Sequence, residues 1–147
     1  MRIWHYKILS YLPKSQLIAQ WRELNSIFKK QDKHILINYI YEYPKENLLL
    51  YTNYVMNEMY RRKIKINSLK NFNDYFKDCG ISARDVKNEK NPFKNHHNNK
   101  YLNQCFYNLQ EKYDRGQKDF SKFLYVDLLT FITKERIENE GNWRIIY

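Results

Sequence analysis

The sequence predicts an all-α fold: a compact single-domain bundle of three long helices, with shorter helices and a basic loop. Only 3 Gly and 3 Pro occur among 147 residues, so few positions interrupt a helix. Apolar residues recur with helical periodicity in the long segments between them. A chain of this length buries about two-thirds of its unfolded surface, which suffices for one core. We therefore expect a single domain over residues 1–147.

The first thirty residues are predicted to form a short extended stretch that runs into a helix. Leu17, Trp21, Leu24 and Phe28 recur at the i, i+4, i+7 spacing of a buried helical stripe. Glu23 lies about 130° from the centre of that stripe, at about 100° per residue. We therefore expect Glu23 on the polar side of this helix.

Several polar residues share that side of the helix. Gln16, Ala19, Glu23 and Lys30 fall along one line, and Arg22 falls on the neighbouring polar flank. Ala19 is small, so it leaves room beside the carboxylate for another molecule to approach. An exposed glutamate on a helix is usually only a solvated residue, so this pattern alone does not indicate catalysis.

Prolines and candidate caps delimit the helices. Pro13 fits a first turn, where its missing N–H would have had no partner, and Ser10 and Ser15 are both possible caps. Pro44 is predicted to open the second long helix. Further helices are expected over residues 44–62, 69–76, 100–114 and 120–139. Residues 34–43 are ambiguous between a short helix and an extended segment, and residues 82–100 form the best loop candidate.

The chain is strongly basic, with a formal net charge of +10. The excess of Lys and Arg lies in the first hundred residues, whereas charges balance in residues 101–147. Such an imbalance indicates a polyanionic partner, of which nucleic acid is the commonest. An AT-rich coding bias, which raises Lys, Asn, Ile and Tyr, is the alternative explanation.

The two cysteines, Cys79 and Cys105, indicate neither a metal site nor a disulfide framework. They lie far apart and no Cys-x-x-Cys occurs. Cys105 falls on the apolar side of its helix and is predicted to be a buried thiol. We expect no metal and no cofactor. No run of eighteen apolar residues occurs, so we expect a cytoplasmic protein without membrane contact.

Three stretches together carry a resemblance to a known family. They are Met-Arg-Ile at the start, followed by Leu12, Leu17, Ala19 and Arg22-Glu23-Leu24; residues 34–66, with a Tyr-Pro break and a final Arg-Arg-Lys; and residues 97–113. In order and spacing they resemble the endonuclease V-type pyrimidine-dimer DNA glycosylases and AP lyases, especially the bacterial branch. The resemblance implies a small all-helical DNA repair enzyme.

The resemblance also implies a mechanism. Members of this family use the α-amine of the chain as a nucleophile on the sugar C1′ and form an imine, after which β-elimination cuts the strand. Position 2 is Arg, and a bulky second residue normally blocks removal of the initiator, so the resemblance assigns the amine to Met1. An α-amine has a pKa of about 7.7 to 8.0, so a useful fraction is unprotonated near neutral pH. Glu23 is then the catalytic carboxylate.

The same resemblance suggests which residues contact DNA. Arg22 is expected to hold phosphate or the distorted strand, and Arg2 and Lys30 are further expected DNA contacts. Gln16 or Ser15 stands where the phage type of the family has a histidine, and Lys112 matches a basic position of the last core helix. His5 and His97 are further candidates for DNA contact, with packed or solvated imidazoles as the alternative.

Two other hypotheses remain open from the sequence. One is a non-catalytic nucleic-acid-binding protein on the same fold, and the other is a glycosylase for another modified base. We expect the protein to be a monomer and its partner to be double-stranded DNA that carries damage. The identity of the lesion depends on pocket shape and is not predicted.

Overall fold

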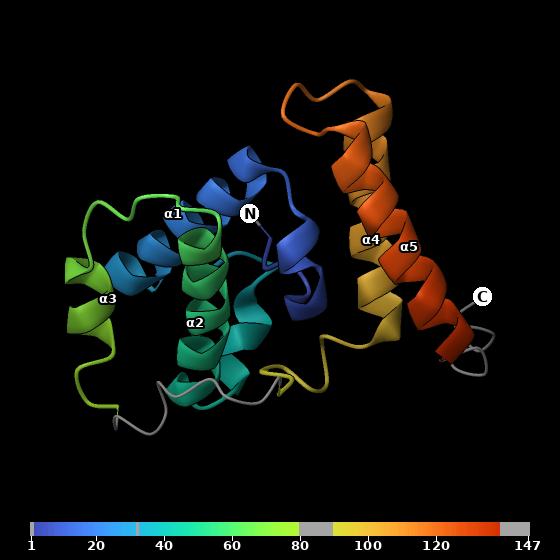
Figure 1. Ribbon diagram of the computed structural model, residues 1–147. Coiled ribbons are helices and arrows are strands. Elements are labelled where there is room, and N and C mark those ends of the chain that lie inside the picture. Colours follow the sequence, from blue (N-terminus) through green and yellow to red (C-terminus); the bar gives the residue numbers. More distant parts are fainter. Residues whose placement is uncertain (1, 32, 80–89, 139–147) are drawn as a thin grey trace.

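The computed structural model describes residues 2–31, 33–79 and 90–138, and every regular element among them is a helix (Figure 1). The all-α prediction is therefore confirmed, but four helices are long instead of three. Met1 and residues 80–89 and 139–147 lie outside the described part, so the N-terminal residue, half of the predicted loop and the C-terminal tail are not placed. The elements are η1 (Tyr6–Tyr11), α1 (Lys14–Lys30), η2 (Asn38–Glu42), α2 (Lys45–Arg61), α3 (Lys70–Tyr75), α4 (Asn99–Asp114) and α5 (Lys122–Glu138).

Two groups of helices meet at the short 3-10 helix η1. Helix α1 packs against α2 and α3, and α4 packs against α5 as an antiparallel pair (Figure 1). Helix η1 contacts α2, α4 and α5, so it joins the two groups. The N-terminal segment is consequently held between α1 and α4, where the candidate site lies.

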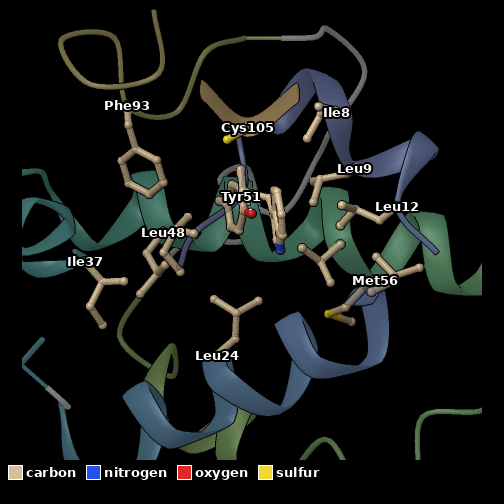
Figure 2. Packing of buried hydrophobic residues seen from close by; sticks show 14 of the residues in the cluster. Ile8, Leu9, Leu12, Leu24, Ile37, Leu48, Tyr51, Met56, Phe93 and Cys105 are labelled. Atoms are coloured by element: carbon tan, nitrogen blue, oxygen red, sulfur yellow. Dashed lines mark hydrogen bonds between the residues drawn. The ribbon is translucent and has the colours of Figure 1, made fainter. Parts of the chain in front are cut away.

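The core is continuous across these elements and contains most of the predicted apolar residues. Tyr51 of α2 is fully buried and lies between Leu24 of α1 and Cys105 of α4 (Figure 2). Cys105 is buried as predicted, and neither cysteine forms a disulfide. On α1 the buried positions are Leu17, Gln20, Leu24, Ile27 and Phe28, whereas Trp21 is only partly buried.

Helix α1 begins at Lys14 after Pro13, and neither predicted serine caps it with a side chain. Instead, the backbone N–H of Ser15 donates a hydrogen bond of 2.7 Å to Oδ2 of Asp119. A carboxylate at a helix N-terminus satisfies an unpaired donor and complements the helix dipole. This cap comes from a residue 104 positions away in sequence, so local pattern could not reveal it.

The predicted extended start is correct only for residues 2–5, because residues 6–11 form η1. Arg62 holds the end of this 3-10 helix. Its guanidinium donates to the carbonyl oxygens of Leu12 (2.6 Å) and Ser10 (2.9 Å) and also binds Glu58 (2.6 Å). The basic end of α2 therefore has a structural role at Arg62, whereas the Arg61 side chain is mostly exposed.

Two predicted irregular segments acquire definite structure. Residues 34–37 form a turn that leads into η2, which resolves the ambiguity in favour of a short helix. The predicted loop is anchored within its described part, because Phe93 is fully buried against Tyr51 and Tyr43. The short helix expected near residues 69–76 is confirmed as α3, with Phe72 and Phe76 buried.

Candidate active site

A pocket of about 230 Å³ lies where the N-terminal segment meets α1 and α4. Four of the predicted site residues line it together: Arg2, Gln16, Glu23 and Lys112. Ala19, the small residue expected to leave room beside the carboxylate, is also part of its wall. The remaining lining residues are Trp4, Gln20, Leu36 and Asn108. Residues that are more than a hundred positions apart in sequence thus share one pocket.

Glu23 is half-buried at the base of this arrangement. Burial raises the pKa of its carboxyl above the ordinary value of 4.5, because the charged form is poorly solvated. The hydrogen bond that the backbone N–H of Arg2 donates to the carboxylate, and the positive charges of Arg22 and Arg2, oppose this rise in pKa. Glu23 therefore directly contacts the backbone at the second residue of the chain.

Gln20 holds Arg2 and Glu23 together. The sequence did not indicate Gln20 as a site residue. Its side chain is buried and donates from Nε2 to the carbonyl of Arg2 (2.9 Å) and to Oε2 of Glu23 (3.2 Å). Its Oε1 accepts from the backbone N–H of Trp4 (2.8 Å) and lies 3.0 Å from the hydroxyl of Tyr51. Gln20 thus ties the N-terminal segment to α1 on both sides of Ile3.

The only sequence signal for Gln20 is its position. It falls in the apolar stripe between Leu17 and Leu24, where a polar side chain must find buried hydrogen-bond partners. A glutamine at such a position is therefore a candidate for a structural link. Its partners, however, are backbone groups that only the fold identifies.

Arg2 lies with its guanidinium 5.6 Å from the centre of the Trp4 ring, a cation–π distance. The guanidinium also lies near the thiol of Cys105. Burial raises the pKa of that thiol to about 11, and the positive charge of Arg2 and its hydrogen bond only partly offset this. Cys105 is therefore a neutral thiol at physiological pH and not a nucleophile.

Arg22 and Lys30 lie outside this pocket. Arg22 is exposed and lines a neighbouring pocket of about 400 Å³ together with Trp21 and Met59. Its positive charge still lowers the pKa of Glu23 to some extent, so the two residues lie on adjacent surfaces of α1. Lys30 is exposed at the last turn of α1, about 10 Å further along the helix axis at 1.5 Å per residue.

The prediction that His5 and His97 contact DNA is not supported, because both imidazoles are buried, at 2% and 1% exposure. Burial lowers the pKa of His5 to about 3 and that of His97 to about 2. Nδ1 of His5 accepts from the N–H of Lys7, so Nε2 carries the proton and donates to the carbonyl of His97 (3.1 Å). Both rings stack on each other and are core residues, as the alternative interpretation held.

The described residues contain no group of three or more His, Cys, Asp or Glu side chains arranged to hold a metal ion. Over the same residues, no helix is both long enough and apolar enough to span a bilayer.

Comparison with known proteins gives one match. Residues 1–72, just under half of the chain, match the model of the family described as pyrimidine dimer DNA glycosylase. No curated protein and no solved structure matches the chain. The match confirms the resemblance over the segment that contains Arg2, Gln20 and Glu23.

Proposed function

Because its first 72 residues match the pyrimidine dimer DNA glycosylase family, we propose that this protein is a DNA repair glycosylase with AP lyase activity. The substrate is a pyrimidine dimer or a related lesion in double-stranded DNA. The nucleophile is the α-amine of Met1, Glu23 is the catalytic carboxylate, and no metal takes part. The observation that carries this proposal is the pair of hydrogen bonds by which Nε2 of Gln20 links the Arg2 carbonyl (2.9 Å) to Oε2 of Glu23 (3.2 Å).

Covalent geometry limits how far the α-amine can lie from Arg2, which Gln20 links to Glu23. In a chain that starts at Met1, standard bond lengths and angles keep the α-amino nitrogen within about 4 Å of the Arg2 nitrogen. The Arg2 backbone lies near enough to the Glu23 carboxylate to lower its pKa. An amine within that distance of the Arg2 nitrogen can reach the same sugar carbon as the Glu23 carboxylate. This proximity supports the assignment of the amine as nucleophile and of Glu23 as catalytic carboxylate.

The chemistry then proceeds without any further nucleophile. The amine nitrogen bonds to C1′ while the C1′–N glycosidic bond breaks, and the base takes that electron pair and a proton. The sugar ring opens at C1′–O4′ to give a protonated imine, with a proton transferred to O4′. Loss of a 2′ proton, followed by cleavage of C3′–O3′, completes β-elimination and releases the phosphate-bearing end. An α-amine needs little activation for the first step.

Glu23 has two roles in this scheme. Its negative charge stabilises the positive charge that develops on the sugar and on the imine. Its raised pKa makes it better matched to proton transfer near neutral pH than an exposed carboxylate would be. Gln20 orients this carboxylate and is therefore a positioning residue.

Cations around the pocket support binding of a phosphate backbone. Lys112 from α4 and Arg2 line the pocket opposite α1, and Arg22 lies on the adjacent surface. Phosphate contacts of this kind position DNA but do not read its sequence. Binding should therefore weaken steeply with salt, through release of counterions.

Trapping with borohydride tests the nucleophile. The full-length protein is incubated with an abasic-site duplex and sodium borohydride, which reduces an imine to a stable covalent bond. We expect a crosslink with the wild-type chain, and none when the N-terminus is acetylated or extended by one residue. A crosslink that persists after acetylation would assign the amine to a lysine and contradict the role of Met1.

Glu23→Gln tests the carboxylate, with Glu111→Gln as a matched control because Glu111 is exposed on α4 and pairs only with Arg115. We expect Glu23→Gln to lower strand cleavage by about 10² to 10⁴-fold with nearly unchanged duplex binding. Equal loss of binding and cleavage would favour the alternative of a non-catalytic binding protein. Duplexes with a dimer, an abasic site or no damage distinguish the lesions.

A further inference from the structure

The turn of residues 34–37 presents two adjacent large apolar side chains to solvent beside the candidate active site. Ile35 is 86% exposed and Leu36 is 48% exposed. Leu36 lines the same pocket as Glu23, so the turn forms part of the rim of that pocket. An aliphatic pair this exposed, at the mouth of a polar pocket, buries little apolar area within the described part of the chain.

The turn is well supported beneath these two side chains. The carbonyl oxygen of His34 accepts from the N–H groups of Ile37 (2.8 Å) and Asn38 (2.9 Å), and Nδ1 of His34 accepts from the N–H of Leu36 (3.2 Å). Ile37 is fully buried and anchors the turn in the core. The backbone therefore holds Ile35 and Leu36 outward in a fixed place.

Exposure alone would not distinguish this turn, since single exposed apolar residues are common on proteins. Phe123, in the first turn of α5, is 87% exposed and lines none of the pockets that contain site residues. Ile35 differs from Phe123 in two respects. Its neighbour Leu36 is part of the pocket wall, and the exposed cation Lys33 lies two residues before it. Apolar side chains beside a cation are suited to a surface that is negative outside and apolar inside, which describes a DNA duplex.

We propose that Ile35 and Leu36 form an apolar wedge that enters the DNA base stack at the lesion and holds the unstacked step open over the pocket. This inference rests on the proposed function. Side chains such as Ile and Leu are inserted between base steps by proteins that kink DNA, and a glycosylase must expose its target from the stack. Adjacent Cα atoms lie about 3.8 Å apart, close to the roughly 3.4 Å rise of one base step.

The placement gives the two residues different tasks. Leu36 contacts the sugar and base that face Glu23, because it is part of the pocket wall. Ile35, one residue further out, fills the gap that the displaced base leaves in the stack. Without Ile35 the gap closes and the bases restack, so cleavage of paired DNA slows.

The test compares Ile35→Ser with Phe123→Ser, a matched loss of an exposed apolar side chain that does not line the pocket. Each variant is assayed on a fully paired lesion duplex and on a duplex whose bases opposite the lesion are mismatched and already unstacked. We expect Ile35→Ser to cleave the paired duplex about tenfold more slowly or worse and the mismatched duplex within about twofold of wild type. Phe123→Ser should match wild type on both. Because both positions are exposed, neither change should unfold the chain.

Fluorescence separates this inference from the proposed function. 2-Aminopurine beside the lesion brightens when it is unstacked, whether or not the strand is cut. We expect brightening on binding of wild type but not of Ile35→Ser. If wild type cleaves the lesion duplex and Ile35→Ser cleaves it at the same rate, the wedge is wrong and the proposed function stands. The same holds if Ile35→Ser is slowed equally on the paired and the mismatched duplex. If wild type cleaves no duplex, the proposed function fails. The wedge is then decided by fluorescence: brightening with wild type but not with Ile35→Ser supports it, and equal brightening contradicts it.

Discussion

Gln20 and Glu23 lie one turn apart on α1, and the Nε2 group of Gln20 donates a hydrogen bond of 3.2 Å to Oε2 of Glu23. The same amide group also donates to the carbonyl of Arg2. The carboxylate and the N-terminal segment are thus held by one buried side chain. This explains how an otherwise simple extended segment keeps a fixed position over α1, since it has no strand partner among the described residues.

Gln20→Met should therefore change the titration of Glu23. A hydrogen bond to the charged form favours that form, so its loss should raise the pKa of Glu23 further. NMR titration of the labelled Glu23 carboxyl carbon should show a midpoint above 4.5 in wild type and a higher one in Gln20→Met. Gln104→Met, at an exposed position of α4, is the control. An unchanged midpoint would mean that Gln20 only supports the fold.

The same substitution leaves the N–H of Trp4 and the carbonyl of Arg2 without a side-chain partner. Each unsatisfied buried polar group costs about 1 to 3 kcal/mol, so the free energy of unfolding of Gln20→Met should fall by at least that amount. Strand cleavage should fall as well, mainly in kcat, because the carboxylate loses its orientation while the phosphate contacts remain. Chemical denaturation and single-turnover kinetics measure the two effects separately.

Glu23→Gln should stabilise the folded chain at neutral pH. Burial raises the pKa of Glu23, so the folded state binds its proton more tightly than the unfolded state does. That contribution to stability is fully present below the unfolded pKa and is lost as pH rises through the folded pKa. A charged Glu23 is thus unfavourable at pH 7, and a neutral glutamine removes this cost.

Thermal unfolding checks this sign. The Tm of Glu23→Gln should exceed that of wild type at pH 7, and the difference should shrink as pH falls below about 4.5. The exposed Glu111→Gln should show no such pattern. A Tm difference of the same size at both pH values would exclude the carboxyl titration as its cause.

The buried histidines predict sensitivity to acid. Burial lowers the pKa of His5 to about 3 and that of His97 to about 2, from an ordinary 6.5. The unfolded chain therefore takes up these protons first, and stability is lost as pH falls from about 6.5 toward the folded values. Each histidine contributes up to about 1.4 kcal/mol per pH unit within that range.

His97→Phe should remove one of these two contributions while it keeps the stacking on Tyr101 and His5. The free energy of unfolding should then fall about half as steeply between pH 6 and pH 4. At pH 7 the variant should be less stable by about 1 kcal/mol, because the hydroxyl of Tyr39 loses its partner at Nε2. Denaturant unfolding across this pH range measures the slope, and the exposed His34→Gln is the control.

The sequence predicted those features that depend on local pattern. Pro44 and the apolar periodicity after it located α2, and the helical angle of Glu23 separated it from the apolar stripe of α1. The pocket that Glu23 shares with Lys112 was not predicted, because those residues lie on helices that local pattern does not bring together; the resemblance named each of them only as a separate site residue.

Other features depend on contacts between distant residues, which no periodicity reveals. His5 is buried because its partner is the carbonyl of His97, 92 positions away. Phe93 lies in a segment that is otherwise polar, yet it fills a place beside Tyr51. Gln20 is polar and would be assigned to the surface on composition alone, although its hydrogen bonds are made in the core.

Arg62 belongs to the basic run Arg61-Arg62-Lys63, which could bind phosphate on charge alone. In the structure, however, its guanidinium binds Glu58 and backbone carbonyls of the chain, and this structural role can be tested. Its side chain is only 17% exposed and pairs with Glu58, which is 9% exposed, at 2.6 Å. Removal of one partner of a largely buried ion pair leaves an uncompensated charge and typically costs about 3 kcal/mol or more.

Arg62→Met should therefore lower the free energy of unfolding by about 2 to 4 kcal/mol, somewhat less than for full burial because Arg61 still pairs with Glu58. Arg61→Met, whose side chain is 64% exposed, should cost about 1 kcal/mol or less. If the basic run served mainly to hold phosphate, the order would differ: Arg61→Met would weaken DNA binding, and Arg62→Met would leave stability unchanged. Denaturant unfolding of both variants, together with duplex binding at two salt concentrations, separates a structural arginine from a phosphate-binding one.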